Sequence, residues 1–329
     1  MTTQGGIFVI SLDFELYWGM RDRVSLDSYG ANLLGVRAVV PALLDLFAEY
    51  AIHATWATVG FLFFTGREDL LLGLPEKQPR YANRRLSPYR DLERLGTDER
   101  QDPFHFAPAL IALIAASPGQ EIGTHTFSHY YCLEPGQDVD AFRDDLAAAI
   151  RIARRYDLRL RSLVFPRNQF NARYLAVCAE MGITAYRGNE SSWIYRARNE
   201  EEESLSRRAV RLVDAYVNLS SHNAYSLRES VGETPRDIPS SRFLRPYSPR
   251  LRLLEPLRAR RIRDDLTHAA RTGRVYHLWW HPHNFGVNLE ENLTFLRQIL
   301  AHYSRLRTAY GMESLNMGEL AAREGRVGR

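Results

Sequence analysis

The chain has 329 residues, of which 45% are hydrophobic and 25% charged, and its formal net charge is +4. These proportions are ordinary for a soluble globular protein, and the length is sufficient for a large buried core. Only two cysteines are present, so no disulfide framework is implied.

The N-terminal residues MTTQGGIFVISLDFE contain no basic segment and reach an acid at Asp13, so we expect no signal peptide. Charged residues interrupt the longest apolar stretches before they reach the roughly 18 uncharged residues of a membrane-spanning helix. We therefore predict a cytoplasmic chain with no transmembrane segment. The sequence leaves the oligomeric state open.

The predicted elements alternate along the chain. In order they are a strand at 6–13, a helix at 30–50, a strand at 53–63, a helix at 106–119, a strand at 121–125, a helix at 138–156, a strand at 160–166, a helix at 169–182, a strand at 183–188, a helix at 201–217, a strand that leads into a histidine-rich turn at 272–284, a helix at 289–311 and a short strand and helix start at 312–323. This alternation predicts an α/β parallel sheet or barrel. We expect a single catalytic domain over residues 1–329, with insertions at about 66–103 and 219–263. The insertion at 66–103 is polar and contains prolines, and long insertions in compact domains are often functional lids.

Almost all the basic residues are arginines, which suit phosphate and carboxylate groups but also follow from genome composition. Residues 242–263 contain eight arginines and one acid, so Arg258, Arg260 and Arg261 could contact an anionic phosphate group. A solvated helix face is the simpler interpretation of the same pattern. Elsewhere the arginines are mixed with acids, and no nucleic-acid motif occurs, so we expect no nucleic-acid partner.

Polar side chains follow four predicted strands, each at its carboxyl end. They are Asp13 and Glu15, His125 and His129, Arg167 and Asn168, and finally His281, His283 and Asn284. Because the carboxyl ends of the strands in an α/β barrel converge on one mouth, these clusters predict one site.

His125 and His129 could bind a metal ion or could simply share a helical face. If the segment THTFSH forms one helical turn, both imidazoles reach the same divalent ion. His277 and His281 have the same spacing, but in a strand they would lie about 13 Å apart and could not share an ion. A carboxylate from Asp13 or Glu15 strengthens the metal interpretation, because acids at the end of an apolar strand need a partner. That partner could equally be an arginine.

Three tryptophans, Trp18, Trp193 and Trp280, are candidates to line a substrate pocket, whereas a core position is favoured for Trp279.

The ordered motifs SLDFE, THTFSH, FPRNQF and WWHPHN resemble those of the polysaccharide deacetylase family, also described as the NodB-homology or carbohydrate esterase family 4 superfamily. The resemblance covers about residues 7 to 322, and it is weak at 66–103 and 189–249. It implies a distorted (β/α)7 barrel, which is TIM-like, and a divalent metal, most simply zinc, with cobalt, manganese or nickel as alternatives. It also implies hydrolysis of an N-acyl group on a sugar.

Carried over residue by residue, the resemblance makes His125 and His129 metal ligands. The acids Asp13-Phe14-Glu15 resemble a variant branch with one residue between them, so Asp13 is the expected general base and Glu15 the third ligand, although the roles could be exchanged. Arg167 would pair with Asp13, but it follows Pro166, the reverse of the family order. His281 is the expected general acid, and His283 is the alternative. Asn168 and His283 are also candidates to contact the substrate.

The expected function is removal of an acetyl or formyl group from a polysaccharide, lipid-linked or nucleotide-linked amino sugar. Two alternatives stay open. One is a non-sugar amidase or imidase on the same barrel. The other is a degenerate barrel that binds glycan without turnover, which the altered acid pair and the reversed Pro-Arg order keep open.

Overall fold

A computed structural model describes residues 5–190, 205–226 and 234–324. Its centre is a parallel sheet with the strand order β6-β5-β4-β3-β2-β1-β8-β7. The strands are β1 Ile7–Phe14, β2 Ala54–Thr58, β3 Gln120–Thr124, β4 Ser162–Leu163, β5 Ala185–Tyr186, β6 Arg236–Asp237, β7 Arg242–Phe243 and β8 Val275–Trp280. A further strand, β9 Glu313–Ser314, pairs in parallel with the start of β1.

The two ends of this strand order are consecutive in the chain, so the sheet curves into a barrel. β6 pairs with β5 and β7 pairs with β8. Between them, the amide of Ser240 donates to Gly188 and the amide of Ser241 donates to His277. One extended segment therefore serves as the closing strand, and the predicted distorted (β/α) barrel is confirmed.

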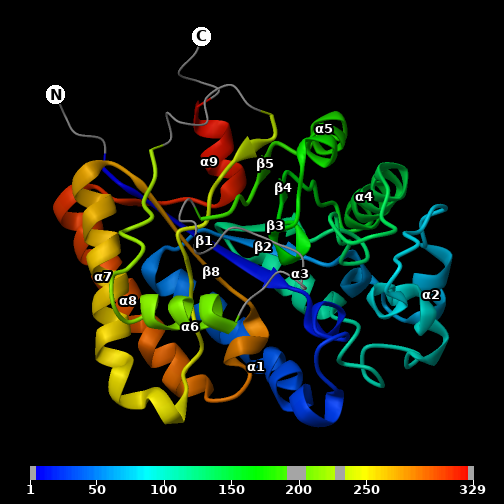
Figure 1. Cartoon of the computed structure of the whole chain (residues 1–329), viewed down its shortest axis with the longest axis horizontal. Helices are drawn as coiled ribbons and strands as arrows, with labels where there is room; N and C mark the ends of the chain where they lie inside the picture. Colours follow the sequence, from blue (N-terminus) through cyan, green and yellow to red (C-terminus); the bar gives the residue numbers. More distant parts are fainter. Residues whose placement is uncertain (1–4, 191–204, 227–233, 325–329) are drawn as a thin grey trace.

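Helices surround the central strands (Figure 1). They are α1 Leu26–Tyr50, α2 Arg67–Leu72, α3 Pro108–Ala116, α4 Val139–Arg154, α5 Ala172–Glu180, α6 Leu205–Asp214, α7 Glu255–Thr272, α8 Leu289–Tyr310 and α9 Met317–Glu324. The predicted helices lie within a few residues of these bounds. The predicted strand at 53–63 is too long, because β2 ends at Thr58 and a 3-10 turn follows over Gly60–Phe63.

The two predicted insertions differ in kind. Residues 66–103 contain α2 and several 3-10 turns, and they are fastened to α4 by a pair between Arg155 and Asp69 at 2.9 Å. Residues 219–263, in contrast, supply β6, β7 and the first half of α7. That part of the second segment belongs to the barrel itself.

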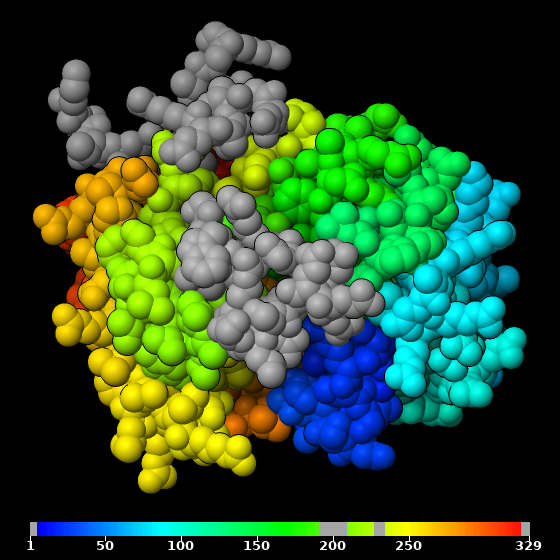
Figure 2. Space-filling view, viewed as in Figure 1, coloured from blue at the N-terminus to red at the C-terminus, as the bar shows by residue number. Residues whose placement is uncertain are grey.

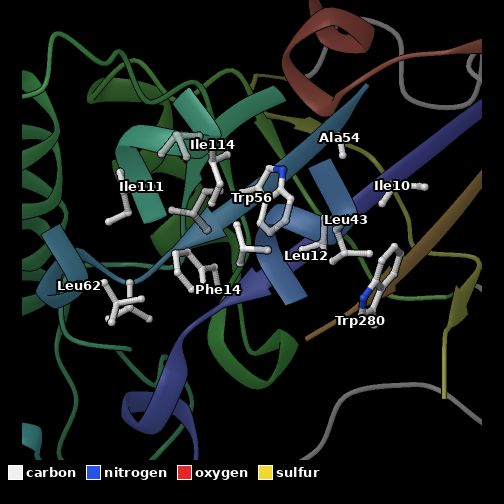
Figure 3. Packing of buried hydrophobic residues seen from close by; sticks show 14 of the residues in the cluster. Ile10, Leu12, Phe14, Leu43, Ala54, Trp56, Leu62, Ile111, Ile114 and Trp280 are labelled. Atoms are coloured by element: carbon white, nitrogen blue, oxygen red, sulfur yellow. The ribbon is translucent and has the colours of Figure 1, made fainter. Parts of the chain in front are cut away.

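Side chains alternate strictly along the central strands. Phe8, Ile10, Leu12 and Phe14 of β1 belong to the large apolar cluster under the helices, where Figure 3 shows the last three with Leu43 of α1. The other face carries Ile7 and Val9 in the small cluster inside the barrel, then Ser11 and Asp13 towards the carboxyl end. This alternation delivers polar side chains to the barrel mouth while the outer face stays apolar.

Among the described residues, α1 is the one helix long and apolar enough to cross a bilayer by length and composition. Its apolar face is a core face in this fold, because Val36, Val40 and Leu43 are fully buried in the large apolar cluster.

Candidate metal centre and barrel mouth

One buried carboxylate lies at the centre of the barrel mouth, surrounded by four imidazoles. Glu15 is 3% exposed. Its Oε2 lies 3.1 Å from Nε2 of His129 and 3.3 Å from Nε2 of His125. Its Oε1 lies 3.3 Å from Nε2 of His283 and 3.6 Å from Nε2 of His281. Three of the four clusters predicted from sequence therefore meet at a single side chain.

The loop that carries His125 and His129 is not the helical turn that we predicted. It is irregular, with left-handed backbone at Thr126 (φ 64°) and His129 (φ 60°). Asp145 of α4 holds it instead, since its carboxylate accepts from the amide of Phe127 at 2.7 Å and from the amide of Ser128 at 3.2 Å. The two imidazoles nevertheless meet, with ring centroids 4.9 Å apart.

We predict that Asp145→Asn lowers the free energy of unfolding by about 1–3 kcal/mol. Both carboxylate oxygens accept hydrogen bonds, and the hydroxyl of Ser128 donates to one of them as well. An amide has one acceptor oxygen, so its NH2 group would face a backbone donor. Urea unfolding measures the difference. Asp140→Asn, on the exposed side of the same helix, is the control and should change the free energy by less than about 1 kcal/mol. Equal effects would contradict this role of Asp145.

The hydrogen bonding of His125 shows what its second nitrogen can do. Nδ1 lies 2.8 Å from the carbonyl oxygen of Val164. A carbonyl oxygen only accepts, so Nδ1 carries the proton and, in a neutral ring, Nε2 presents a lone pair. That lone pair faces the Glu15 carboxylate, which also only accepts. Two acceptors at 3.3 Å repel each other unless a cation or an extra proton lies between them.

The spacing of these atoms fits a metal ion. Donor atoms about 2.1 Å from a tetrahedral zinc ion lie about 3.4 Å from one another. The distances from Glu15 Oε2 to His125 and His129 are 3.3 and 3.1 Å. Glu15, His125 and His129 form a fully buried group whose ligand atoms all lie within 4.8 Å of one another. Glu15, His281 and His283 form a second such group through the other carboxylate oxygen.

The electrostatics favour an ionised Glu15 carboxylate and a neutral His129 ring. Burial would raise the pKa of Glu15, but the surrounding imidazoles, His281 foremost, hold it well below its usual value. Burial lowers the pKa of His129 to about 4, although Glu15 opposes the shift. A carboxylate and a neutral imidazole are the forms that bind a divalent ion.

The second acid, Asp13, is held by an arginine. Its Oδ1 and Oδ2 accept from the two NH2 groups of Arg187 at 2.6 and 2.8 Å. Burial would raise the pKa of Asp13, yet the charges of Arg187, His125 and His281 hold it below its usual value. Asp13 is thus fixed as a carboxylate beside the Glu15 cluster, with its Oδ2 3.7 Å from Nε2 of His281.

The expected pairing of Asp13 with Arg167 is wrong. Arg167 donates to Asp22 and lies 3.7 Å from Glu134, with its guanidinium 4.4 Å from the ring centre of Tyr131. The reason is backbone geometry. Arg167 has a left-handed backbone (φ 56°) in the turn after β4, and its side chain makes these contacts beside the site.

Sequence reasoning missed Arg187, although a signal was present. In the strand segment ITAYRG, Ala185 lies inside the barrel and Tyr186 packs in the outer cluster. The alternation then returns Arg187 to the inner face at the carboxyl end of β5, the position that Asp13 has on β1.

A buried network fixes Arg187. It donates to Ser11 Oγ at 3.1 Å and to Asn168 Oδ1 at 3.1 Å. The Ser11 hydroxyl in turn donates to His277 Nε2 at 2.8 Å, because His277 Nδ1 faces the Pro239 carbonyl oxygen. Burial lowers the pKa of His277 to about 3, so this ring is neutral and serves to orient its neighbours.

Asn168, a predicted substrate contact, forms hydrogen bonds with other residues of the site. Its side-chain oxygen accepts from Arg187, and its own amide donates to the Phe165 carbonyl oxygen. Its side-chain oxygen and its backbone N–H are therefore both engaged within the protein. Of the two candidate acids, His283 is buried between Glu15 and Tyr29, whose hydroxyl lies 2.9 Å from Nδ1. His281 is 22% exposed and reaches solvent.

The tryptophan assignments on β8 are reversed in the structure. Trp280 is fully buried beneath α1 and stacks with Phe285, which makes it a core residue (Figure 3). Trp279 faces the barrel interior, with the Arg187 guanidinium 4.1 Å from its ring centre. Trp18 is buried with its indole N–H donating to the His105 carbonyl oxygen. Trp193 lies outside the described residues.

The proposed phosphate contact on α7 does not hold for two of its three arginines. Arg258 donates to Glu255 and stacks on Phe295 at 3.9 Å. Arg261 donates to Asp265 and to the Ser221 carbonyl oxygen. Both are buried by these partners, and only Arg260 is exposed.

Comparisons with known proteins agree with this architecture. The family model for polysaccharide deacetylase matches residues 29–186. A protein of Mycobacterium smegmatis assigned as a polysaccharide deacetylase has a TM-score of 0.61 at 16% identity, with 99% of this chain and 92% of that one covered. A protein of Pseudomonas aeruginosa with the same assignment has a TM-score of 0.56 at 13% identity, covering 98% and 92%. A search of curated proteins gives no match.

A third structure shares the fold but not the name. An allantoinase aligns with a TM-score of 0.58 at 11% identity, covering 98% of this chain and 91% of that one. Likeness at this level of identity extends to the barrel alone. Residues 29–186 thus match the polysaccharide deacetylase family model, and the chain shares its barrel fold with these structures.

Proposed function

We propose that this protein is a metal-dependent hydrolase that removes an N-acyl group from an amino sugar. Sugar deacetylation is the activity that the family supports. The observation that carries the metal dependence is the buried 3.3 Å approach of His125 Nε2 to a Glu15 carboxylate oxygen, while Nδ1 of the same ring faces the Val164 carbonyl oxygen. A divalent cation resolves that contact.

Glu15, His125 and His129 would hold the ion, most simply zinc, while cobalt, manganese and nickel accept the same donors. When bound, a divalent ion supplies Lewis acidity, which lowers the pKa of water and polarises an acyl oxygen. Glu15 is the ligand in this proposal rather than Asp13, because both oxygens of Asp13 accept from Arg187.

Asp13 is the proposed general base. Arg187 fixes its carboxylate and keeps it ionised, so it can take the proton of an attacking water. Arg187 acts through Asp13 and is a positioning residue.

His281 is the proposed general acid. Its ring combines access to solvent with a place 3.7 Å from Asp13, so a proton taken by Asp13 has a short route to the departing amine. An amine leaves poorly as an anion, which makes this proton transfer necessary. Burial lowers the pKa of His281, although Glu15 and Asp13 oppose the shift. A lowered pKa makes the protonated ring a stronger acid, which suits proton donation to the departing amine.

The experiment that tests this function measures released acid. Purified protein is loaded with zinc and incubated with N-acetylated and N-formylated sugars, free, nucleotide-linked and in oligomers. We expect acid release that stops on chelation and returns with metal. Release only from non-sugar amides would favour an amidase. Glycan binding without release in the metal-loaded protein would favour a non-catalytic barrel. The cytoplasmic location stays a prediction.

A further inference from the structure

A groove of about 490 Å³ lies beside the barrel mouth, between the turn that follows Glu15 and the insertion at 66–103. Figure 2 shows the blue surface of the N-terminal residues against the cyan surface of the insertion. The groove is lined by five arginines and two aspartates, with Tyr17 and Trp18 among its other walls. Its volume is that of a small-molecule site, not of a macromolecular interface.

The two acids in the groove are already neutralised. Asp22 accepts from Arg167, and Asp91 lies 3.3 Å from Arg94. Three further arginines, Arg84, Arg85 and Arg90, are exposed, and their side chains have no ion-pair or hydrogen-bond partner in the described part of the chain. Their positive charge is therefore available to a ligand.

Hydrogen bonds hold the backbone of the wall that carries Arg84 and Arg85. Arg84 and Arg85 begin a 3-10 turn whose cap, Asn83, accepts from the Arg85 amide at 3.1 Å. Arg21 fastens that turn to the barrel, because its guanidinium donates to the carbonyl oxygens of Arg85 and Leu86.

The groove also adjoins the candidate metal centre. Gly19 is packed so closely on Glu15 that a Cβ atom there would lie within 2.4 Å of the carboxylate. On the other side, Asp22 pairs with Arg167, which covers Tyr131, whose ring centre lies 5.1 Å from that of His129. The Arg167 and Tyr131 side chains thus lie between the groove and the ring of His129.

We infer that this groove binds an oxyanion of the substrate, a phosphate or a carboxylate attached to the acylated sugar. Arginine side chains offer paired donors that match both groups. The inference rests on the proposed function for the identity of the substrate, and it replaces the phosphate contact expected on α7. It also gives a role to the insertion that the sequence marked as a lid.

Equilibrium binding tests the inference without requiring turnover. The ligands are N-acetylglucosamine, N-acetylglucosamine 1-phosphate and N-acetylglucosaminuronic acid, measured by calorimetry. We expect the anionic ligand that fits to bind at least about tenfold more tightly than the neutral sugar, and less tightly as salt is raised. The phosphate and the uronate arms distinguish the two sources of the oxyanion.

The triple variant Arg84→Gln, Arg85→Gln, Arg90→Gln should abolish that preference. The control variant Arg252→Gln, Arg271→Gln, Arg307→Gln removes the same charge from exposed positions elsewhere and should keep it. Equal affinity for charged and neutral sugars, no binding of either anion at millimolar concentration, or an unchanged preference in the triple variant would overturn the inference.

The His125→Ala variant separates this inference from the proposed function. If the groove binds oxyanions, the preference persists in that variant although hydrolysis is lost. If the proposed function alone is wrong, the wild-type protein hydrolyses no acyl sugar but still binds the anionic sugar more tightly than the neutral one. If the groove inference alone is wrong, the wild-type protein hydrolyses neutral acyl sugars but binds anionic and neutral sugars equally.

Discussion

Replacing His125 with alanine is expected to remove the bound divalent ion and to lower the rate of acyl hydrolysis by about 10³-fold or more. The ring supplies one of three protein ligands. Lewis acid catalysis lowers the activation barrier by several kcal/mol, and about 1.4 kcal/mol corresponds to a tenfold change in rate. Metal content per chain and steady-state kinetics measure the two effects together.

The fold should survive this substitution better than the activity does. The variant removes the contact in which a lone pair faces the Glu15 carboxylate, so the metal-free protein should not lose stability in proportion to its activity. His302→Ala on α8 is the control, since its ring contacts Thr267 away from the barrel mouth. Full metal content and full activity in His125→Ala would contradict the assignment of this ligand.

Replacing Arg187 with methionine is expected to lower both activity and stability. Asp13 would become a buried carboxylate without its ion-pair partner, which costs about 3–5 kcal/mol in other proteins. Loss of an oriented general base should lower the rate by about 10²- to 10⁴-fold. Urea unfolding and steady-state kinetics on the folded variant measure the two effects.

The pH dependence of stability follows from the charges around Asp13. In the wild type its pKa lies below the usual value, so the pair stabilises the fold above the unfolded pKa and this contribution disappears as the pH falls. In Arg187→Met, the charge of Arg187 no longer opposes the effect of burial, so the pKa of Asp13 rises. The destabilisation should therefore be largest at neutral pH and should shrink on acidification, as Asp13 takes up a proton.

A matched variant isolates the role of Arg187 at the site. Arg242 is equally buried and pairs with Asp214 and Asp265 away from the metal ligands. Arg242→Met should destabilise the protein while the folded fraction keeps its turnover rate. Arg187→Lys keeps the charge without the paired donors and should recover part of the activity. Equal turnover in Arg187→Met and the wild type would exclude its positioning role.

The strand ends were predictable from sequence because hydrophobic runs followed by polar clusters mark them directly. Asp13, Glu15, His125, His129 and His281 were each placed at such an end, and the structure brings them together. Their ligand and acid-base roles are proposals that the measurements above test.

What the sequence did not predict depends on contacts distant along the chain. The loop that orients His125 and His129 is held by Asp145, a buried acid on a helix whose pattern looks simply amphipathic. The partner of Asp13 comes from β5, and only the inward alternation of that two-residue strand distinguishes Arg187 from Arg167. The register of β8 likewise decides that Trp279, and not Trp280, faces the site.

We propose that Glu15, His125 and His129 hold the catalytic ion. Anomalous X-ray diffraction from zinc-loaded crystals tests it most directly, because the signal locates the ion itself. We expect one strong peak within bonding distance of Nε2 of His125, Nε2 of His129 and a carboxylate oxygen of Glu15. A peak at His281 and His283 alone, or no peak in the barrel mouth after saturation with zinc, would contradict it.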